Sequence, residues 1–340
     1  MARRMKSKIQ PAVQTLTFST PTVPAKDSET GEPGTRDFYI DISQCASLVN
    51  RRFYRQGLNW AVSSIKILSG GFEGYVLIQK LPNTWIMSNA WEKGFRAWQH
   101  MIKNAVDESG TQSVKGKFLD FKIFADGGHH KAGFNSNLRP RDGDLNLYAP
   151  GQWQASTIEL PSTTANPGSA FAYEIVAVGD NSSGGASGLN AKSLILGYAS
   201  SRALPSQQDP NVPDDASDGD ENWFATLFND GTDQDTDVIQ MLEITGDNPP
   251  YPFENDKFGN TDTMYPGGQN NASALEMHDY NTITASTIGG ETMSKGGNFP
   301  CGLIKVRAGN TTTTSHNIVV QVNLVPGNHR GYLAESMTEM

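Results

Sequence analysis

The stretch NWAVSSIKIL, residues 59–68, decides the fold class of this chain. Large apolar residues alternate in it with small or polar ones, as in a strand that buries one face: Trp60, Val62, Ile65 and Ile67. The alternation shifts by one position at Ser63-Ser64, where one extra residue would form a β-bulge. A Gly-Gly turn and a second apolar run, YVLI at residues 75–78, follow at once. The sequence therefore predicts neighbouring β-strands here.

Similar runs recur along the chain. The other candidate strands are Phe38–Ile42, Phe118–Phe124, Trp153–Leu160, Phe171–Val178, Leu194–Tyr198, Val238–Ile244, Leu303–Arg307 and Ile318–Val325. The 34 Gly and 18 Pro among 340 residues favour turns over helices. The sequence has no repeat of fixed period, which excludes propellers and solenoids. We therefore expect an all-β fold with long surface loops.

One segment, Ala90 to about Val106, has the period of a helix. Asn89 is the expected N-cap and Glu92 stands at N3, the spacing of a capping box. Apolar residues at spacings of three and four share one face of this helix: Trp91, Phe95, Trp98, Ile102 and Val106. We expect this amphipathic helix to pack against the end of a sheet.

The expected organisation is one large β domain with two appendages. Residues 1–36 contain few large apolar side chains and predict an N-terminal arm that is basic at its start. The domain itself should cover residues 37–330, with long loops at 179–300, and residues 331–340 should form a C-terminal tail. No apolar run approaches the roughly 20 residues that span a bilayer, and no secretory signal is expected. Cys45 and Cys301 are expected to be buried free thiols.

Charge is distributed unevenly along the chain. The net charge of −9 argues against a generic nucleic-acid-binding domain. The arm nevertheless begins with Arg3, Arg4, Lys6 and Lys8 and no acid, whereas residues 205–262 carry fifteen acids and one base. Such a chain can present opposite signs to two environments.

The acidic region offers a candidate calcium site, because hard cations prefer several carboxylate oxygens. The candidate ligands are Asp214, Asp218, Asp220, Asp233 and Asp235. Their spacing does not match the twelve-residue loop of helix-loop-helix calcium sites. The alternative is a solvated acidic loop that keeps the protein soluble through mutual repulsion.

The sequence contains none of the common catalytic signatures, neither a nucleophile elbow, a zinc-protease motif, a phosphate loop nor a dinucleotide fingerprint. The nearest candidate is DGGHHK, residues 126–131, with Arg139, Arg141, Asp142 and Asp144 downstream. Its glycines favour a solvated loop; a basic patch facing nucleic acid or a neighbouring subunit, and a catalytic or metal site, are the alternatives. We expect no enzymatic activity.

Three stretches resemble a known family. They are CASLVNRRFYRQGLNW at 45–60, KLPNTWIMSNAWEKGFRAW at 80–98 and NLVPGNHRGYLA at 323–334. They are similar to capsid proteins of circular Rep-encoding single-stranded DNA viruses, particularly bacilladnavirus-like and unclassified environmental members. The likeness covers roughly residues 37–125 and 299–334.

The resemblance implies a single jelly-roll β-sandwich of two four-stranded antiparallel sheets. It also implies a structural protein that self-assembles into an icosahedral shell around a small single-stranded DNA genome. The implied partners are other copies of the chain, that DNA and an unknown host-cell receptor, without a membrane. The implied locations are the virion and, during assembly, the host nucleus or cytoplasm. The family points its N-terminal arm inward, which makes Arg3, Arg4, Lys6 and Lys8 candidate DNA contacts.

This chain departs from the family in having a short basic arm, which would bind the genome weakly per copy. Arg51, Arg52 and Arg55 are candidates for further inward-facing charge, with salt bridges between subunits as the alternative. A second hypothesis is a jelly-roll carbohydrate-binding or viral fibre module that uses Trp85, Trp153 or Tyr251 as stacking platforms. A third is a β-sandwich glycoside hydrolase or lyase that uses two acids such as Asp235 and Asp237.

Overall fold

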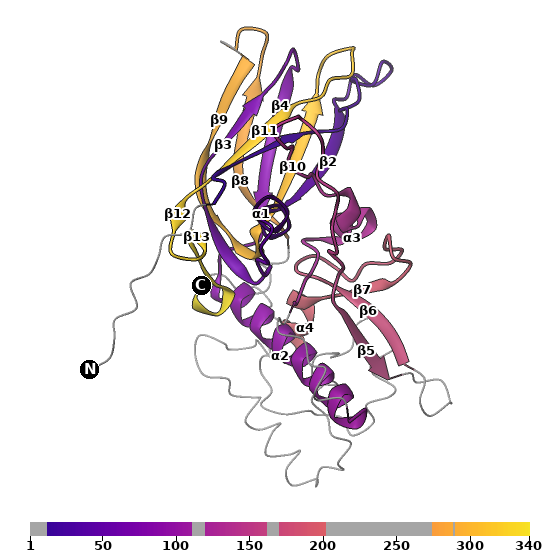
Figure 1. Ribbon diagram of the computed structural model, residues 1–340. Coiled ribbons are helices and arrows are strands. Elements are labelled where there is room, and N and C mark those ends of the chain that lie inside the picture. Colours follow the sequence, from indigo (N-terminus) through magenta and orange to yellow (C-terminus); the bar gives the residue numbers. More distant parts are fainter. Residues whose placement is uncertain (1–11, 111–119, 162–169, 202–273, 288–289) are drawn as a thin grey trace, which may run out of the picture. The chain divides into compact units, whose positions relative to one another are not determined.

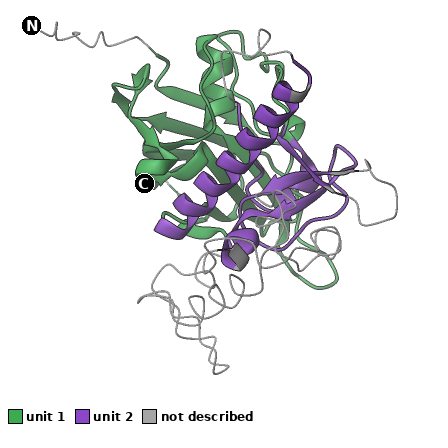
Figure 2. Cartoon of the chain, turned by 90° about the horizontal axis from the view of Figure 1, so that it is seen from below, with its two compact units in different colours: residues 1–83, 134–154, 275–340 green, residues 84–133, 155–274 purple. Residues whose placement is uncertain are grey.

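The computed structural model describes residues 12–110, 120–161, 170–201, 274–287 and 290–340 (Figure 1). The chain divides into two compact units (Figure 2). Unit 1 consists of residues 1–83, 134–154 and 275–340, and unit 2 of residues 84–133 and 155–274. Each unit is described by itself.

Unit 1 is built from antiparallel sheets. Its main strands are β1 (Thr15–Ser19), β2 (Gly34–Asp41), β3 (Leu58–Leu68), β4 (Gly74–Lys80), β8 (Glu276–Ile283), β9 (Glu291–Phe299), β10 (Leu303–Asn310) and β11 (Val319–Leu324). One sheet has the order β1-β11-β3, with β9 on the other side of β3, and the second has the order β2-β10-β4-β8. The short strands β12 (Pro326–Gly327) and β13 (Gly331–Tyr332) pair with each other, and β14 (Ala334–Ser336) pairs with the start of β3. The expectation of a mostly β protein with antiparallel sheets is thus confirmed.

The predicted bulge in β3 is confirmed. The register between β11 and β3 shifts between Asn323, opposite Ser64, and Leu324, opposite Val62, so Ser63 is the extra residue. The buried side chains of β3 accordingly change from Trp60 and Val62 to Ile65 and Ile67. The bulge keeps both halves of the strand facing the same core, because one inserted residue reverses the alternation.

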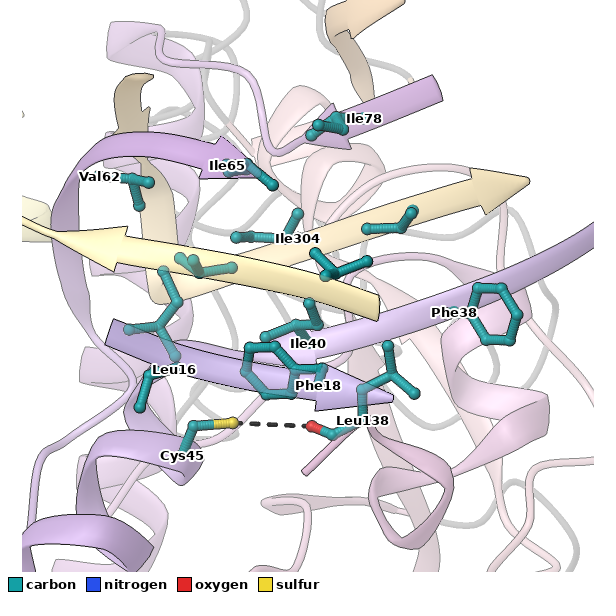
Figure 3. Packing of buried hydrophobic residues seen from close by; sticks show 14 of the residues in the cluster. Leu16, Phe18, Phe38, Ile40, Cys45, Val62, Ile65, Ile78, Leu138 and Ile304 are labelled. Carbon is teal, nitrogen blue, oxygen red and sulfur yellow. Dashed lines mark hydrogen bonds between the residues drawn. The ribbon is translucent and has the colours of Figure 1, made fainter. Parts of the chain in front are cut away.

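The core of unit 1 lies between the two sheets (Figure 3). Leu16, Phe18, Val62 and Ile65 come from the first sheet, and Phe38, Ile40, Ile78 and Ile304 come from the second. Seven of these eight side chains are at most 3% exposed and Phe38 is 4% exposed. Burial of each such side chain contributes about 1.5–3 kcal/mol. Cys45 and Cys301 are buried free thiols, as expected.

A buried carboxylate, Asp41, anchors the helix that follows β2. It is the N-cap of α1 (Ile42–Asn50) and accepts from the N–H groups of Ser43 and Gln44. Its second oxygen accepts from Gln56 Nε2 at 3.0 Å and Trp153 Nε1 at 2.9 Å. Burial raises the pKa of Asp41 to about 6, although these four donors favour the carboxylate. α1 was not predicted, although Ile42, Cys45, Ala46 and Val49 recur at the helical spacings of three and four, because the predicted strand Phe38–Ile42 was extended over its first residue.

Three boundary predictions for unit 1 were wrong. Residues 15–19 and 34–36 of the expected arm belong to strands, and β1 pairs with β11. The expected tail contains Tyr332 and Met337, which are fully buried. The segment expected as loops up to residue 300 contains β8 and β9, whose polar and Gly-containing sequences gave little strand signal.

Unit 2 combines helices with a small sheet. Its elements are α2 (Trp85–Glu108), α3 (Gly127–Ala132), β5 (Thr157–Pro161), β6 (Ala170–Val176), β7 (Asn190–Ser193) and α4 (Leu194–Ser201). β6 pairs antiparallel with β5 and parallel with β7. Among the described residues, no helix is long and apolar enough to cross a membrane.

The long helix α2 begins one turn earlier than predicted. Thr84, not Asn89, is its N-cap, and the Thr84 hydroxyl accepts from the N–H of Met87. The expected aromatic face is confirmed: the rings of Trp91, Phe95 and Trp98 each lie 5.5–5.9 Å from that of Phe121. The helix contacts both β5 and α4.

Two predicted strands of unit 2 differ in the structure. Leu194–Tyr198 was predicted as a strand but lies in α4, because a short apolar run fits a buried strand and a buried helix equally well. Of Phe118–Phe124, the described part makes a single parallel bridge, from Phe124 to Val176. Val238–Ile244 lies outside the described residues.

Candidate nucleic-acid interface

The three arginines predicted to contact DNA follow α1 on the surface of unit 1. Arg51 is the C-cap of this helix in the left-handed conformation, with φ of 52°, and so turns the chain out of the helix. Arg51, Arg52 and Arg55 are exposed, whereas Tyr54 between them is fully buried. The loop therefore keeps three cationic side chains at the surface, while the buried ring of Tyr54 fixes the position of its backbone.

The anchor belongs to a cluster of rings beneath the loop. The Tyr54 ring lies 5.8 Å from Trp60 and 5.5 Å from Tyr332, and Trp60 and Tyr332 lie 5.4 Å apart. The Tyr54 hydroxyl donates to the carbonyl of Arg330 at 3.0 Å. These contacts join the loop after α1 to residues 329–332, which are remote in sequence.

This connection adds two basic residues that the sequence reasoning did not select, Arg330 and His329. Arg330 is exposed and its guanidinium donates to the carbonyl of Phe53. Burial and the positive charges of Arg330 and Arg55 hold the pKa of His329 below its ordinary value. The available signal was the run NHRG at 328–331, within the third stretch that carries the resemblance.

The described chain starts beside the same loop. The N–H of Val13 donates to Asn50 Oδ1 at 3.2 Å, and the carbonyl of Val13 accepts from the Tyr332 hydroxyl at 2.7 Å. Asn50 in turn donates to that hydroxyl at 2.7 Å. Arg3, Arg4, Lys6 and Lys8 lie outside the described residues, but the segment that carries them joins unit 1 at this point.

Backbone conformation singles out two of these arginines. Among the described residues, four that are not glycine have positive φ: Arg51, Leu145, Cys301 and Arg330. The left-handed conformation costs a residue with a Cβ roughly 1–2 kcal/mol, and glycine is the usual occupant. Arginine at both positions favours a role for the side chain that offsets this strain.

The cluster of Arg51, Arg52, Arg55, Arg330 and His329, which we call the basic cluster, can bind polyanions. Within the described residues, Arg51, Arg55 and Arg330 form no ion pair with a carboxylate. Exposed guanidinium groups bind phosphate oxygens through paired N–H donors, and the tyrosine and tryptophan rings beneath them restrict the backbone that carries them. Phosphate contacts of this kind confer affinity without sequence preference.

The predicted calcium ligands are not placed by the structure. Asp214, Asp218, Asp220, Asp233 and Asp235 all lie outside the described residues, so this site stays a prediction. In the part of the chain that is described, no group of three or more His, Cys, Asp or Glu side chains is arranged to hold a metal ion. Asp237, a candidate hydrolase acid, also lies outside that part.

The segment at residues 126–131 was expected as a solvated loop, and this is wrong. It forms α3, with Asp126 as N-cap accepting from the His129 N–H at 2.8 Å. Both His129 and His130 are fully buried, because α3 packs into unit 2. The four downstream residues considered with it belong to unit 1: Arg139, Arg141, Asp142 and Asp144.

His130 lies between a serine and a carboxylate. Its Nδ1 is 2.9 Å from Ser182 Oγ and its Nε2 is 3.1 Å from Glu174 Oε2. The combination resembles the serine, histidine and acid of hydrolases, but a nucleophile must be reached by its substrate. His130, Glu174 and Ser182 are 0%, 5% and 8% exposed. We therefore interpret the group as a structural tie between α3, β6 and the loop at residue 182.

The stacking platforms proposed for a carbohydrate module receive little support. Trp153 is 8% exposed and its Nε1 is committed to Asp41, so this ring is a core residue. Trp85 is half-buried in the first turn of α2, and Tyr251 lies outside the described residues.

Comparisons with protein-family models, curated proteins and solved structures return no match to this chain.

Proposed function

We propose that this chain is the coat protein of a small virus, a non-catalytic subunit that assembles into an icosahedral shell around single-stranded DNA. The virion would be its place of action. The observation that carries the proposal is the basic cluster, which gathers four exposed arginines where the basic start of the chain joins unit 1. The resemblance of residues 45–60, 80–98 and 323–334 to capsid proteins of single-stranded DNA viruses agrees with it.

The strand pairing supports a jelly roll, the expected fold of such a subunit. A jelly roll contains eight strands in two Greek keys and can be described as four nested antiparallel pairs, the first strand with the eighth and so on inward. In unit 1, β1 pairs with β11, β2 with β10, β3 with β9 and β4 with β8, all antiparallel. On this reading, residues 81–275 are an insertion between the two innermost strands that carries unit 2.

Assembly can be tested directly. Purified protein should form closed particles of uniform diameter in electron microscopy under some condition of salt and pH. Analytical ultracentrifugation should then show a species far larger than a dimer. A monomer under every salt and pH condition would contradict the proposal.

The DNA contact can be tested with matched charge changes. Changing Arg51, Arg52, Arg55 and Arg330 together to Gln should weaken binding of single-stranded DNA and lower the salt slope of log K by up to about 3, at about 0.7 per phosphate contact. The control removes four exposed lysines elsewhere: Lys26, Lys103, Lys131 and Lys295. Equal loss in both variants would show that binding depends on net charge alone and would contradict the assigned interface.

A further inference from the structure

Among the residues that the structure describes, one edge of the sandwich in unit 1 is left open. β8 pairs with β4 on one side only, and within the described residues its other side has no backbone partner. Its sequence EMHDYNTI contains no Lys or Pro, so its protection as an edge strand is limited to a bulge at His278 and the inward-facing charge of Asp279. Two of its apolar side chains are strongly exposed, Met277 at 64% and Tyr280 at 52%.

The other three edges of the sandwich are covered by this chain itself. The N–H of Leu138 donates to the carbonyl of Tyr39 on β2, and the N–H of Arg141 donates to that of Thr17 on β1. On β9, the N–H of Lys295 donates to Asp279 and its carbonyl lies 3.0 Å from His278 Nε2. Within the described residues, β8 differs from β1, β2 and β9 in that no other segment contacts its outer backbone groups; the N–H of Tyr280 donates to Oδ1 of the adjacent Asp279 at 3.1 Å.

The outer face of β8 continues an aromatic row. Tyr280 stacks on Tyr75 of β4, with ring centroids 5.6 Å apart. The register places Tyr75 opposite Thr282, Leu77 opposite Tyr280 and Gln79 opposite Met277, and it skips His278 as a bulge. Met277, Tyr280 and Thr282 consequently share the outer face, whereas Asp279 points toward β9 and accepts from Ser294.

We propose that β8 pairs antiparallel with β8 of a second copy about a two-fold axis at Tyr280. The proposal rests on the proposed function, because it names one of the contacts that the shell would repeat. In this register Tyr280 faces its own counterpart and extends the row to four tyrosine rings. Asp279 faces Asn281 of the second copy, and, with the bulge at His278 retained, Met277 faces Thr282.

Charge decides between this register and its neighbours. An axis at Asp279 would place two carboxylates opposite each other, which destabilises a strand pair. An axis at Asn281 would place Asp279 opposite Ile283 and leave its charge without a polar neighbour. The axis at Tyr280 avoids both arrangements and covers the exposed apolar side chains. A single strand pair is small compared with a stable interface, so the contact acts through its repetition in the shell.

Cysteine cross-linking tests the contact in the full-length chain. Opposed residues of an antiparallel pair have Cα atoms about 4.5–5.5 Å apart, within disulfide reach. Tyr280→Cys should therefore form a disulfide-linked dimer under mild oxidation, at least about tenfold faster than Thr282→Cys, whose two copies would lie about 13 Å apart. The double variant Met277→Cys with Thr282→Cys should also cross-link. Cys45 and Cys301 are buried and contribute little background.

A charge on the edge tests the same contact by disruption. Met277→Lys should abolish cross-linking of Tyr280→Cys, whereas Met293→Lys, an equally exposed methionine on β9, should not. Equal cross-linking of Tyr280→Cys and Thr282→Cys in protein that forms particles would overturn this contact and leave the shell intact. Specific cross-linking at Tyr280 in protein that never forms particles would support the contact and contradict the shell.

Discussion

The two units of this chain are stabilised in different ways. Unit 1 encloses an apolar core between sheets whose paired strands are far apart in sequence, such as Thr15 and Asn323, 308 positions apart. Unit 2 also buries apolar side chains, such as Phe121 and Ile175, but it contains in addition a fully buried histidine, His130, between Ser182 and Glu174. Unit 1 should therefore respond mostly to lost volume, whereas unit 2 should also respond to lost hydrogen bonds and to protonation.

The largest effect is expected for a cavity in unit 1. Trp60→Ala removes a fully buried ring that packs on Tyr54 and Tyr332 and should lower the free energy of unfolding by about 3–5 kcal/mol. Trp98→Ala, on a half-buried ring in unit 2, should cost clearly less. Urea unfolding measures both, and equal losses would show that the two units depend on aromatic burial to the same extent.

The second effect concerns the buried carboxylate of unit 1. Asp41→Asn should cost about 1–3 kcal/mol, because the new amide group would face the N–H donors of Gln56 or Trp153. Asp37→Asn, on a carboxylate that is partly exposed beside Arg307 and Lys305, is the control and should cost less. Thermal unfolding compares the two variants. If both substitutions lower the free energy of unfolding equally, the four hydrogen bonds that Asp41 accepts stabilise unit 1 no more than the partly exposed ion pairs of Asp37.

The third effect should separate the units by pH. Burial lowers the pKa of His130, although Glu174 opposes this, so the folded state favours the neutral imidazole. A histidine of this kind contributes stability above its unfolded pKa, and that stability is lost as pH falls below about 6.5, by at most about 1.4 kcal/mol per pH unit. Hydrogen exchange in α3 and β6 should therefore accelerate on acidification.

The matched variants for this test are His130→Gln and His100→Gln, the latter on the exposed side of α2. Only His130→Gln should flatten the pH dependence of exchange in α3 and β6. An unchanged slope in that variant would assign the acid sensitivity to other groups. Ser182→Ala should also raise exchange at every pH, because it removes a hydrogen bond of 2.9 Å.

The smallest effect separates stability from binding in unit 1. Arg51→Gly relieves a left-handed residue and should raise the free energy of unfolding by up to about 1 kcal/mol, while removing one cation from the basic cluster. DNA affinity should fall as stability rises. Arg55→Gln is the control, since it removes a charge without a positive φ and should lower affinity alone.

Local patterns predicted those elements whose side chains alternate strongly. The bulge at Ser63 and the shared face of Trp91, Phe95 and Trp98 followed from spacing alone, because side-chain period is a local property. β8 and β9 were missed because EMHDYNTI and ETMSKGGNF contain few apolar residues; they form strands through pairing with β4 and β3. The N-cap of α2 was misplaced because Asn89 and Thr84 are both suitable capping residues.

The candidate site was predicted in part. Arg51, Arg52 and Arg55 are adjacent in sequence, so their charge was evident, whereas Arg330 and His329 join them only through the contacts of Tyr54 and Tyr332. The burial of His129 and His130 was missed because glycines beside polar residues indicate a loop unless a neighbouring sheet covers them.

The sequence by itself determined the β character of unit 1, the position of its bulge and the separation of basic and acidic segments, since each depends on neighbouring residues. Only the tertiary structure decided which strands pair, which edge of the described sheets has no partner strand, and that Arg330 lies beside the loop of Arg51, Arg52 and Arg55. Backbone hydrogen-bonding groups are the same for every residue type except proline, so the choice among strand partners is made by how the whole core packs.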